Sequence, residues 1–509
     1  RTYLDWLGPE DEVRDIDPTS DPTSFDVATV NIEENGNKQP FNYVLPPDIE
    51  RQVVAGSAIP GLLMNEQSIV MRICDLQDGD ARGVFRNMNF DLRNYKRLKM
   101  WVHAEADNNG DVPANFSQCG DLNVFIRLGT DYSENYYEYE MPLCPSDPAG
   151  GASDPANIWP DTNQIDFALD LLPEAKVLRN QARRNGIIRF NERFPRQVPN
   201  QSGHTVYVKG NPQLNNIKSI LIGVRNTRDN SGPVCVEVWV NELRVTDFNT
   251  TNGWAANARL NMKLADLATV QMSGSFSSAY FGGLEQRISE RPLEEFRSYD
   301  ILANVSAGKL LPEALGMEIP FTFTIGERWT IPIYNPLDPD VTLETVLATF
   351  NPGEQDSIFD QRITYERVFG YSFNNVRHRR TKEGKKPMPW DLANWDFTFA
   401  YNERFKSSAQ LEYDLTETYK FGVGYSFQWE PPKIQPFKGD GSKRNLLTEF
   451  NFIPLPKAVG VRLDGDRQFD AQKLRTFEGQ LEAQPTFQQN FLITRTYQLQ
   501  WDFATSLNL

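Results

Sequence analysis

The sequence has no apolar run of the 18 or so residues that a membrane-spanning helix needs, so helical spans are excluded. Membrane β-strands are not excluded, because their apolar and polar residues alternate. Basic residues are also few: 52 lysines and arginines face 68 acidic residues, a net charge of −16. Because phosphate binding needs a basic face, this balance argues against nucleic acid as a partner.

Residues with catalytic or metal-binding chemistry are scarce as well. The three histidines, His103, His204 and His378, are too scattered to suggest a catalytic triad or a metal site. No HExxH, GxSxG or Walker pattern is present. We therefore expect no enzymatic activity, no cofactor and no metal.

All four cysteines lie in the first half of the chain. Cys119 and Cys144 flank two strand-like segments joined by a turn at 129–135, so an antiparallel hairpin would place these two cysteines opposite each other. Cys74 and Cys235 then form the second candidate disulfide. Disulfides would indicate an oxidising compartment, such as the periplasm or the cell surface. Four buried free thiols are the alternative.

The first 250 residues divide into two predicted parts. Residues 1–45 are rich in Pro and Asp without periodicity, which predicts a linker or an extended segment. Short strand-like runs with turns then predict a β-sandwich over 46–250, similar to the jelly rolls of carbohydrate-binding modules. One helix is expected near 171–185, because Pro173 suits its first turn and Gly186 suits its C-terminal cap.

Beyond residue 250 the alternating runs become longer. About 12 candidate strands occupy 251–509, many near the 9–11 residues that a tilted membrane strand requires. Arginine should be tolerated better at Gly424, on the polar face of its strand, than on the apolar face. The candidate lipid-facing residues are Phe397, Phe399, Tyr401, Phe421, Val423, Tyr425 and Phe427.

Alternation alone also fits a large soluble β-protein, which likewise buries one face of each strand. Strand length and an opposite face rich in Gly, Ser, Thr, Asn and Gln favour a membrane barrel. Tryptophans also fall at strand ends, where an aromatic girdle belongs. The candidate girdle is Trp254, Trp329, Trp395 and Trp429. The predicted fold class is all-β: a jelly-roll-like sandwich, then about 12 antiparallel strands of a very large transmembrane β-barrel.

One segment, 377–387, is strongly basic in this acidic protein. One interpretation is contact with lipid phosphates or with an acidic partner. The other is a solvated loop between two long strands. The residues concerned are Arg377, Arg379, Arg380, Lys382, Lys385 and Lys386.

Several strings, in order, resemble the SprA/Sov family, the giant outer-membrane translocon of the type IX secretion system in Bacteroidetes. The stretch VWVNELRVTDF at 238–248 fits this family too. The strings that carry the resemblance lie at 273–291 (SGSFSSAYFGGLEQRISER), 299–323, 333–341 (IYNPLDPDV), 401–427 and 491–509.

The resemblance implies a very large single-chain barrel, of which this chain would supply about a third, in the outer membrane. Such a barrel passes folded cargo proteins with a C-terminal secretion signal to the cell surface. The implied partners are a FadL-like outer-membrane barrel protein at a lateral opening, a periplasmic plug protein and outer-membrane lipid. Gliding motility is a further association of the family.

Two other functions stay open at this point. One is a secreted or cell-surface carbohydrate-binding or adhesin-like β-protein. The other is a TonB-dependent transporter, although the sandwich does not resemble the plug domain that such a transporter needs. Because the chain starts without Met and stops inside a strand-like run, we expect an internal part of a longer protein.

Overall fold

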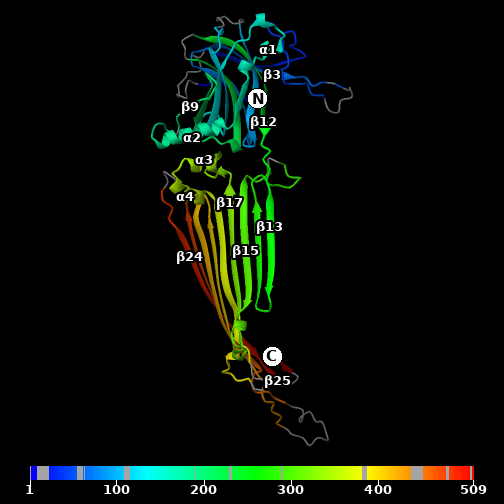
Figure 1. Ribbon diagram of the computed structural model, residues 1–509, viewed down its shortest axis with the longest axis vertical. Coiled ribbons are helices and arrows are strands. Elements are labelled where there is room, and N and C mark those ends of the chain that lie inside the picture. Colours follow the sequence, from blue (N-terminus) through cyan, green and yellow to red (C-terminus); the bar gives the residue numbers. More distant parts are fainter. Residues whose placement is uncertain are drawn as a thin grey trace. The chain divides into compact units, whose positions relative to one another are not determined.

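The computed structural model contains two compact units (Figure 1). The sandwich unit is Arg1–Thr250 with Asp338–Thr342, and the sheet unit is Thr251–Leu337 with Leu343–Leu509. No described helix is long and apolar enough to span a membrane. The described residues are 2–7, 22–53, 61, 63–107, 115–189, 191–227, 232–287, 290–380, 387–436, 451–476, 481–504 and 507–508.

The sandwich unit consists of two antiparallel sheets, which confirms the predicted all-β class. The seven-stranded sheet, in spatial order, is β1 (Thr2–Leu7), β4 (Ala81–Phe90), β11 (Ile217–Asn226), β6 (Leu122–Gly129), β7 (Tyr136–Leu143), β10 (Thr205–Lys209) and β9 (Phe194–Gln197). The five-stranded sheet is β2 (Ser24–Asn31), β3 (Gln67–Leu76), β12 (Val234–Phe248), β5 (Tyr95–Ala106) and β8 (Ile165–Ala168).

Strand β12 shows how the sequence builds the core of this unit. Val236, Val238 and Val240 belong to the main core cluster, together with residues of β6 and β7. Trp239 points to the opposite face and packs in a second buried cluster with Trp159. Because both faces of β12 are covered, its sequence is apolar almost throughout rather than alternating.

Two segments differ from the prediction or refine it. Residues 1–45, predicted as a linker or an extended segment, contain β1 and β2, one strand in each sheet. The alternation in β2 covers only eight residues, so the surrounding Pro and Asp obscured it. The helix expected near 171–185 is α2 (Leu171–Arg184), in which Pro173 is the third residue and Gly186 adopts a positive φ of 70° just after the end. A one-turn helix, α1 (Pro155–Ile158), precedes it.

The sheet unit is built around one antiparallel sheet of ten strands, in which the long strands lie side by side (Figure 1). The chain passes from each long strand to its neighbour, so the sheet is a meander. Among the described residues β13 does not pair with β24, so this sheet is open. The long strands are β13 (Ala255–Leu264), β14 (Ala268–Ser277), β15 (Glu294–Ser306), β17 (Pro320–Pro332), β20 (Thr364–His378), β21 (Trp395–Ser407), β22 (Leu411–Gln428), β23 (Ala458–Leu474) and β24 (Thr486–Gln500).

Shorter elements complete the description. The tenth strand of the sheet, β16 (Met317–Glu318), pairs with β20. Helices α3 (Leu343–Ala348) and α4 (Pro352–Arg362) lie between β17 and β20 in the sequence. The remaining short strands are β18 (Tyr334–Asn335), β19 (Asp338–Thr342), β25 (Asp502–Ala504) and β26 (Leu507–Asn508).

Candidate functional site

The strand register sorts the long sheet into one apolar and one polar face. Phe399 pairs with Phe373 on one side and with Phe421 on the other. Because paired residues in neighbouring strands point to the same face, this parity continues across all nine long strands. The apolar face carries Leu260, Met272, Ile301, Phe323, Ile325, Phe369, Phe373, Phe399, Phe421, Leu463 and Val461.

The predicted lipid-facing residues lie together on this apolar face. Phe397 pairs with Val423, and Tyr401 with Tyr419. Phe397 is 49% exposed and Phe421 38% exposed within the chain. Large apolar side chains left uncovered over a whole sheet face indicate a surface that contacts something other than water.

The opposite face has a recurring arrangement that the sequence analysis did not anticipate. Four glycines each pair directly with an Asp or Asn of the next strand: Gly326 with Asp300, Gly370 with Asn402, Gly422 with Asp464 and Gly424 with Asp396. In each case the polar side chain occupies the space above the glycine, so that an added Cβ would lie within 2.7 Å of its oxygen. The polar side chains therefore lie flat against the sheet.

This arrangement corrects the expectation for Gly424. A Cβ there would lie 2.1 Å from the Asp396 carboxylate. Asp396 also pairs with Arg462, at 2.8 Å, and Arg462 pairs with Asp464, at 2.9 Å. Any side chain at position 424 would disrupt these ion pairs, so the position is intolerant although it lies on the polar face.

A row of charged and tyrosine side chains crosses the apolar face toward one end of the strands. We call Glu327, Arg367, Glu403, Glu417 and Arg467 the polar row. Arg367 is paired with Glu403. Tyr401 donates a hydrogen bond to Glu403 (2.9 Å), Tyr365 donates one to Glu327 (3.0 Å), and Arg467 lies over the ring of Tyr419.

The polar row divides the strands that carry it, β17 and β20–β23, into two parts. On one side of the row lie segments 368–378, 419–428 and 458–466, whose lengths match the 9–11 residues of a tilted membrane strand. On the other side the strands continue for a few more residues. An apolar stretch of this number of residues, bordered by Tyr, Arg and Glu, is typical of a membrane strand that ends at the lipid headgroups.

The four candidate girdle tryptophans fall at both ends of the sheet. Trp254 precedes β13 and Trp329 lies near the end of β17, which places both at one end of the antiparallel strands. Trp395 begins β21 and Trp429 follows β22, at the other end. The Trp395 ring lies 5.1 Å from the Tyr425 ring, and Trp329 lies 5.6 Å from Tyr365.

The described arginines of the basic segment do not form one cluster. Arg377 pairs with Glu318 (2.6 Å) and Arg380 with Asp391 (3.5 Å), while Arg379 lies just beyond the end of β20. The lysines Lys382, Lys385 and Lys386 lie outside the described residues. The described residues contain no cluster of three or more His, Cys, Asp or Glu side chains that would hold a metal ion.

Packing contacts explain His103 and His204. His103 lies in the buried aromatic cluster, 4.2 Å from Trp239, and burial lowers its pKa to about 3. His204 lies next to Tyr139, whose hydroxyl is 2.8 Å from its Nδ1. His378 ends β20 in the sheet unit.

The structure joins Cys119 to Cys144 and Cys74 to Cys235. The first pair closes the β6–β7 hairpin just beyond the partners Leu122 and Leu143. The second pair links β3 and β12 at an irregularity in their register between Val234 and Val236.

A buried ion cluster in the sandwich unit was not anticipated from the sequence. Lys176 of α2 is fully buried, and its Nζ lies 2.6 Å from Asp338 and 3.3 Å from Asp340. Tyr137 donates a hydrogen bond to Asp340 (2.7 Å), and the backbone N–H of Leu214 donates another (2.5 Å). Burial raises the pKa of Asp340, whereas Lys176 and these hydrogen bonds favour its ionised form.

The two aspartates of this cluster lie far from Lys176 in the sequence, in a segment that follows a strand of the sheet unit. Asp338–Thr342 follows β17 of the sheet unit, but it belongs to the sandwich unit. The chain therefore leaves the sheet unit after Leu337, adds the segment Asp338–Thr342 to the sandwich unit without joining either of its two sheets, and returns at Leu343. Lys176 fixes this strand through its two aspartates.

Comparison with known families identifies the chain. A family model described as "Motility related/secretion protein" (SprA_N) matches residues 3–347. The chain belongs to the SprA family. No curated protein matches it. Its role is thus related to motility or secretion, and the family is described by these processes rather than by an enzymatic reaction.

The SprA-family match includes all but the first two residues of the sandwich unit, with β19 and the ion cluster around Lys176. It also includes a second buried charge cluster, formed by Glu138 and Glu140 of β7 with arginines of three other segments. Arg127, Arg193 and Arg225 all pair with Glu138, which is fully buried. Burial alone would raise the pKa of Glu138, but the three arginines outweigh it and hold the pKa well below the ordinary value.

The Glu138 cluster predicts a pH dependence of stability. Because the pKa of Glu138 is lower in the folded state, its contribution is complete above about pH 4.3, the ordinary value for Glu, and is lost as the pH falls below it. We expect Glu138→Gln to destabilise the protein at pH 7, and the difference from the native protein to shrink steadily as the pH falls below about 4. Urea unfolding at several pH values would measure this difference. A difference independent of pH would contradict the prediction.

Proposed function

We propose that the chain forms part of the wall of a protein-conducting channel in the outer membrane, the translocon of type IX secretion. The channel passes folded cargo proteins to the cell surface, with a link to gliding motility. The observation that carries this proposal is the long sheet, with its apolar face, its polar opposite face and the polar row that crosses the apolar face toward one end of the strands.

The apolar face supports a location in lipid. Each buried Phe, Leu or Ile side chain contributes about 1.5–3 kcal/mol, so a face of this size left in water would favour aggregation. A soluble adhesin or carbohydrate-binding protein would expose this apolar face to water, which is unfavourable. The aromatic cluster of the sandwich also offers no sugar platform, because Trp159 and Trp239 are at most 1% exposed.

The polar face supports a role as a conduit wall. Several of its charges are paired within the sheet, as in Lys420 with Asp466 (3.3 Å) and Lys406 with Glu366 (2.8 Å). Paired charges and side chains held flat over glycines leave few groups to bind a passing protein. Such a wall suits transport of many different folded proteins, and the energy for transport would come from elsewhere.

The two open edges of the sheet fit a much larger barrel. An unpaired strand edge in a bilayer would leave backbone N–H and C=O groups without partners, so β13 and β24 require further strands or a partner. Arg495 on β24 supports this, because it pairs with Leu463 on the apolar face, at a level where a lipid-exposed arginine is costly. A FadL-like barrel protein, a periplasmic plug and cargo are the partners we propose for the complete assembly.

The test is a pull-down of the tagged full-length protein from native outer membranes in mild detergent, read by mass spectrometry. We expect co-recovery of a FadL-like barrel protein or a plug protein together with exported cargo. A TonB-dependent transporter would instead be recovered with TonB-type energy-coupling proteins and without protein cargo. Recovery of the protein alone from the soluble fraction would refute the channel.

A further inference from the structure

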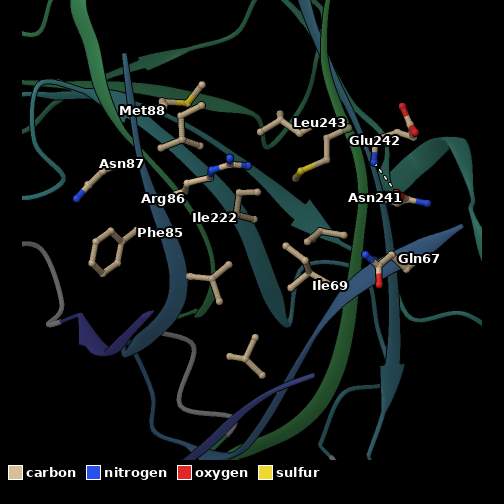
Figure 2. Close-up of a pocket in the computed structure, with 15 residues that line it drawn as sticks. Gln67, Ile69, Phe85, Arg86, Asn87, Met88, Ile222, Asn241, Glu242 and Leu243 are labelled. Carbon is tan, nitrogen blue, oxygen red and sulfur yellow. Dashed lines mark hydrogen bonds between the residues drawn. The ribbon is translucent and has the colours of Figure 1, made fainter. Parts of the chain in front are cut away.

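The sandwich unit contains a cavity of about 880 Å³ between its two sheets, near the edge formed by β2, β3 and β4 (Figure 2). Apolar side chains line it from both sheets: Ile69 of β3, Val84 and Met88 of β4, Ile222 of β11 and Leu243 of β12. The volume lies within the range of about 300–1,000 Å³ that is typical of small-ligand pockets.

The cavity exists because the core is incompletely filled at this edge. Toward the centre of the sandwich, core residues such as Val124 and Val238 are fully buried. Near the cavity, Ile69 and Val84 are only partly buried although they pack against the same core. An apolar cavity open at an edge favours an apolar occupant, because water gains few hydrogen bonds there.

One charged side chain faces the cavity. Arg86 is exposed on β4, and no described residue forms an ion pair or hydrogen bond with its side chain. Figure 2 shows its guanidinium group extending among the lining residues, between Ile222 and Met88. The carboxylate of Glu242 also belongs to the lining, but it points away from the cavity.

We propose that this cavity binds a long-chain fatty acid, with the acyl chain between the two sheets and the carboxylate at Arg86. A guanidinium group forms strong charge-assisted hydrogen bonds with carboxylates, which gives the site its preference for an anionic head. The apolar lining provides most of the affinity and the arginine provides the specificity.

The polar lining argues against a peptide as the occupant. Asn241 is the buried amide of the lining, and its groups are already engaged. Its Nδ2 donates to Tyr43 and Glu66, at 3.1 Å each, and its Oδ1 accepts from the Glu242 backbone N–H at 2.8 Å. Besides Arg86 and the amide of Gln67, backbone groups of an inserted peptide would find few partners in this mostly apolar lining, and unpaired buried amides are costly.

The test uses a C16 fatty acid with a diazirine in mid-chain, photo-cross-linked to the full-length protein in native outer membranes. Peptide mass spectrometry is expected to locate the label in 84–88, 220–222 and 240–243. Unlabelled C16 fatty acid should compete at least tenfold better than the C16 alcohol, because only the acid forms a charged hydrogen bond. Arg86→Gln should abolish the difference in competition between acid and alcohol. Met88→Trp should block labelling, because the larger side chain would fill part of the cavity.

Both variants alter side chains at the rim rather than in the closed core, so we expect them to fold. Lys218→Gln, an exposed change on β11, is the matched control for loss of a positive charge. Labelling confined to the apolar face of β20–β24 would overturn the proposal, as would equal competition by acid and alcohol. Neither result depends on whether the sheet unit conducts protein, so the two proposals are tested separately.

Discussion

Replacing Asp340 with alanine is expected to destabilise the sandwich unit by about 3–5 kcal/mol, the usual cost of removing one partner from a buried ion pair. Asp340 accepts hydrogen bonds from Lys176, Tyr137 and the Leu214 backbone, and its side chain is fully buried. Its loss leaves three donors with fewer partners, and only Asp338 and the Pro212 carbonyl still hold the Lys176 ammonium.

Urea unfolding of the native and variant proteins would measure this effect, and limited proteolysis around 333–343 would show whether β19 leaves the sandwich unit. Lys176→Met combined with Asp340→Leu should recover part of the loss, since an apolar pair can replace a buried ion pair at little cost. Glu344→Ala, an exposed change at the start of α3, is the control. A loss below about 1 kcal/mol for Asp340→Ala would show that β19 is not held by this cluster.

Features set by local periodicity could be predicted from the sequence. The alternation in 419–429 assigns Phe421 and Val423 to the apolar face, because a strand turns its side chains with a period of two whatever it packs against. The hairpin around residues 129–135 likewise brings Cys119 and Cys144 together through its own symmetry. The family strings at 273–323 added the identity, which the family match confirms.

Features that depend on distant contacts could not be predicted in this way. Lys176 resembles a solvated helix residue, and only the arrival of a strand 162 positions later makes it buried and paired. Glu138 lies in a strand in which Tyr and Glu alternate, a pattern that predicts a solvent-exposed face for the glutamates. In the structure three arginines from other segments pair with Glu138 instead. The pairing of glycines with Asp and Asn depends on the register between neighbouring strands. That register cannot be predicted from the sequence of a single strand.

Replacing Val423 with arginine is the sharpest test of the membrane-facing sheet. Val423 lies on β22, between the polar row at Glu417 and the end of the strand at Gln428, and it pairs with Phe397 and Leu463 on the apolar face. If this segment crosses the bilayer, Val423 is near the midplane, and arginine there should cost about 2–4 kcal/mol. Urea titration of the outer-membrane protein and its level in outer-membrane fractions would measure the loss.

The matched control is Ser426→Arg, which lies on the polar face of the same strand and is exposed. It is preferable to Gly424, where any side chain would collide with Asp396. We expect Ser426→Arg to cost less than about 1 kcal/mol, because its side chain remains in water. Equal tolerance at both positions would mean that the apolar face around Val423 contacts water rather than lipid, and it would refute the membrane-facing sheet.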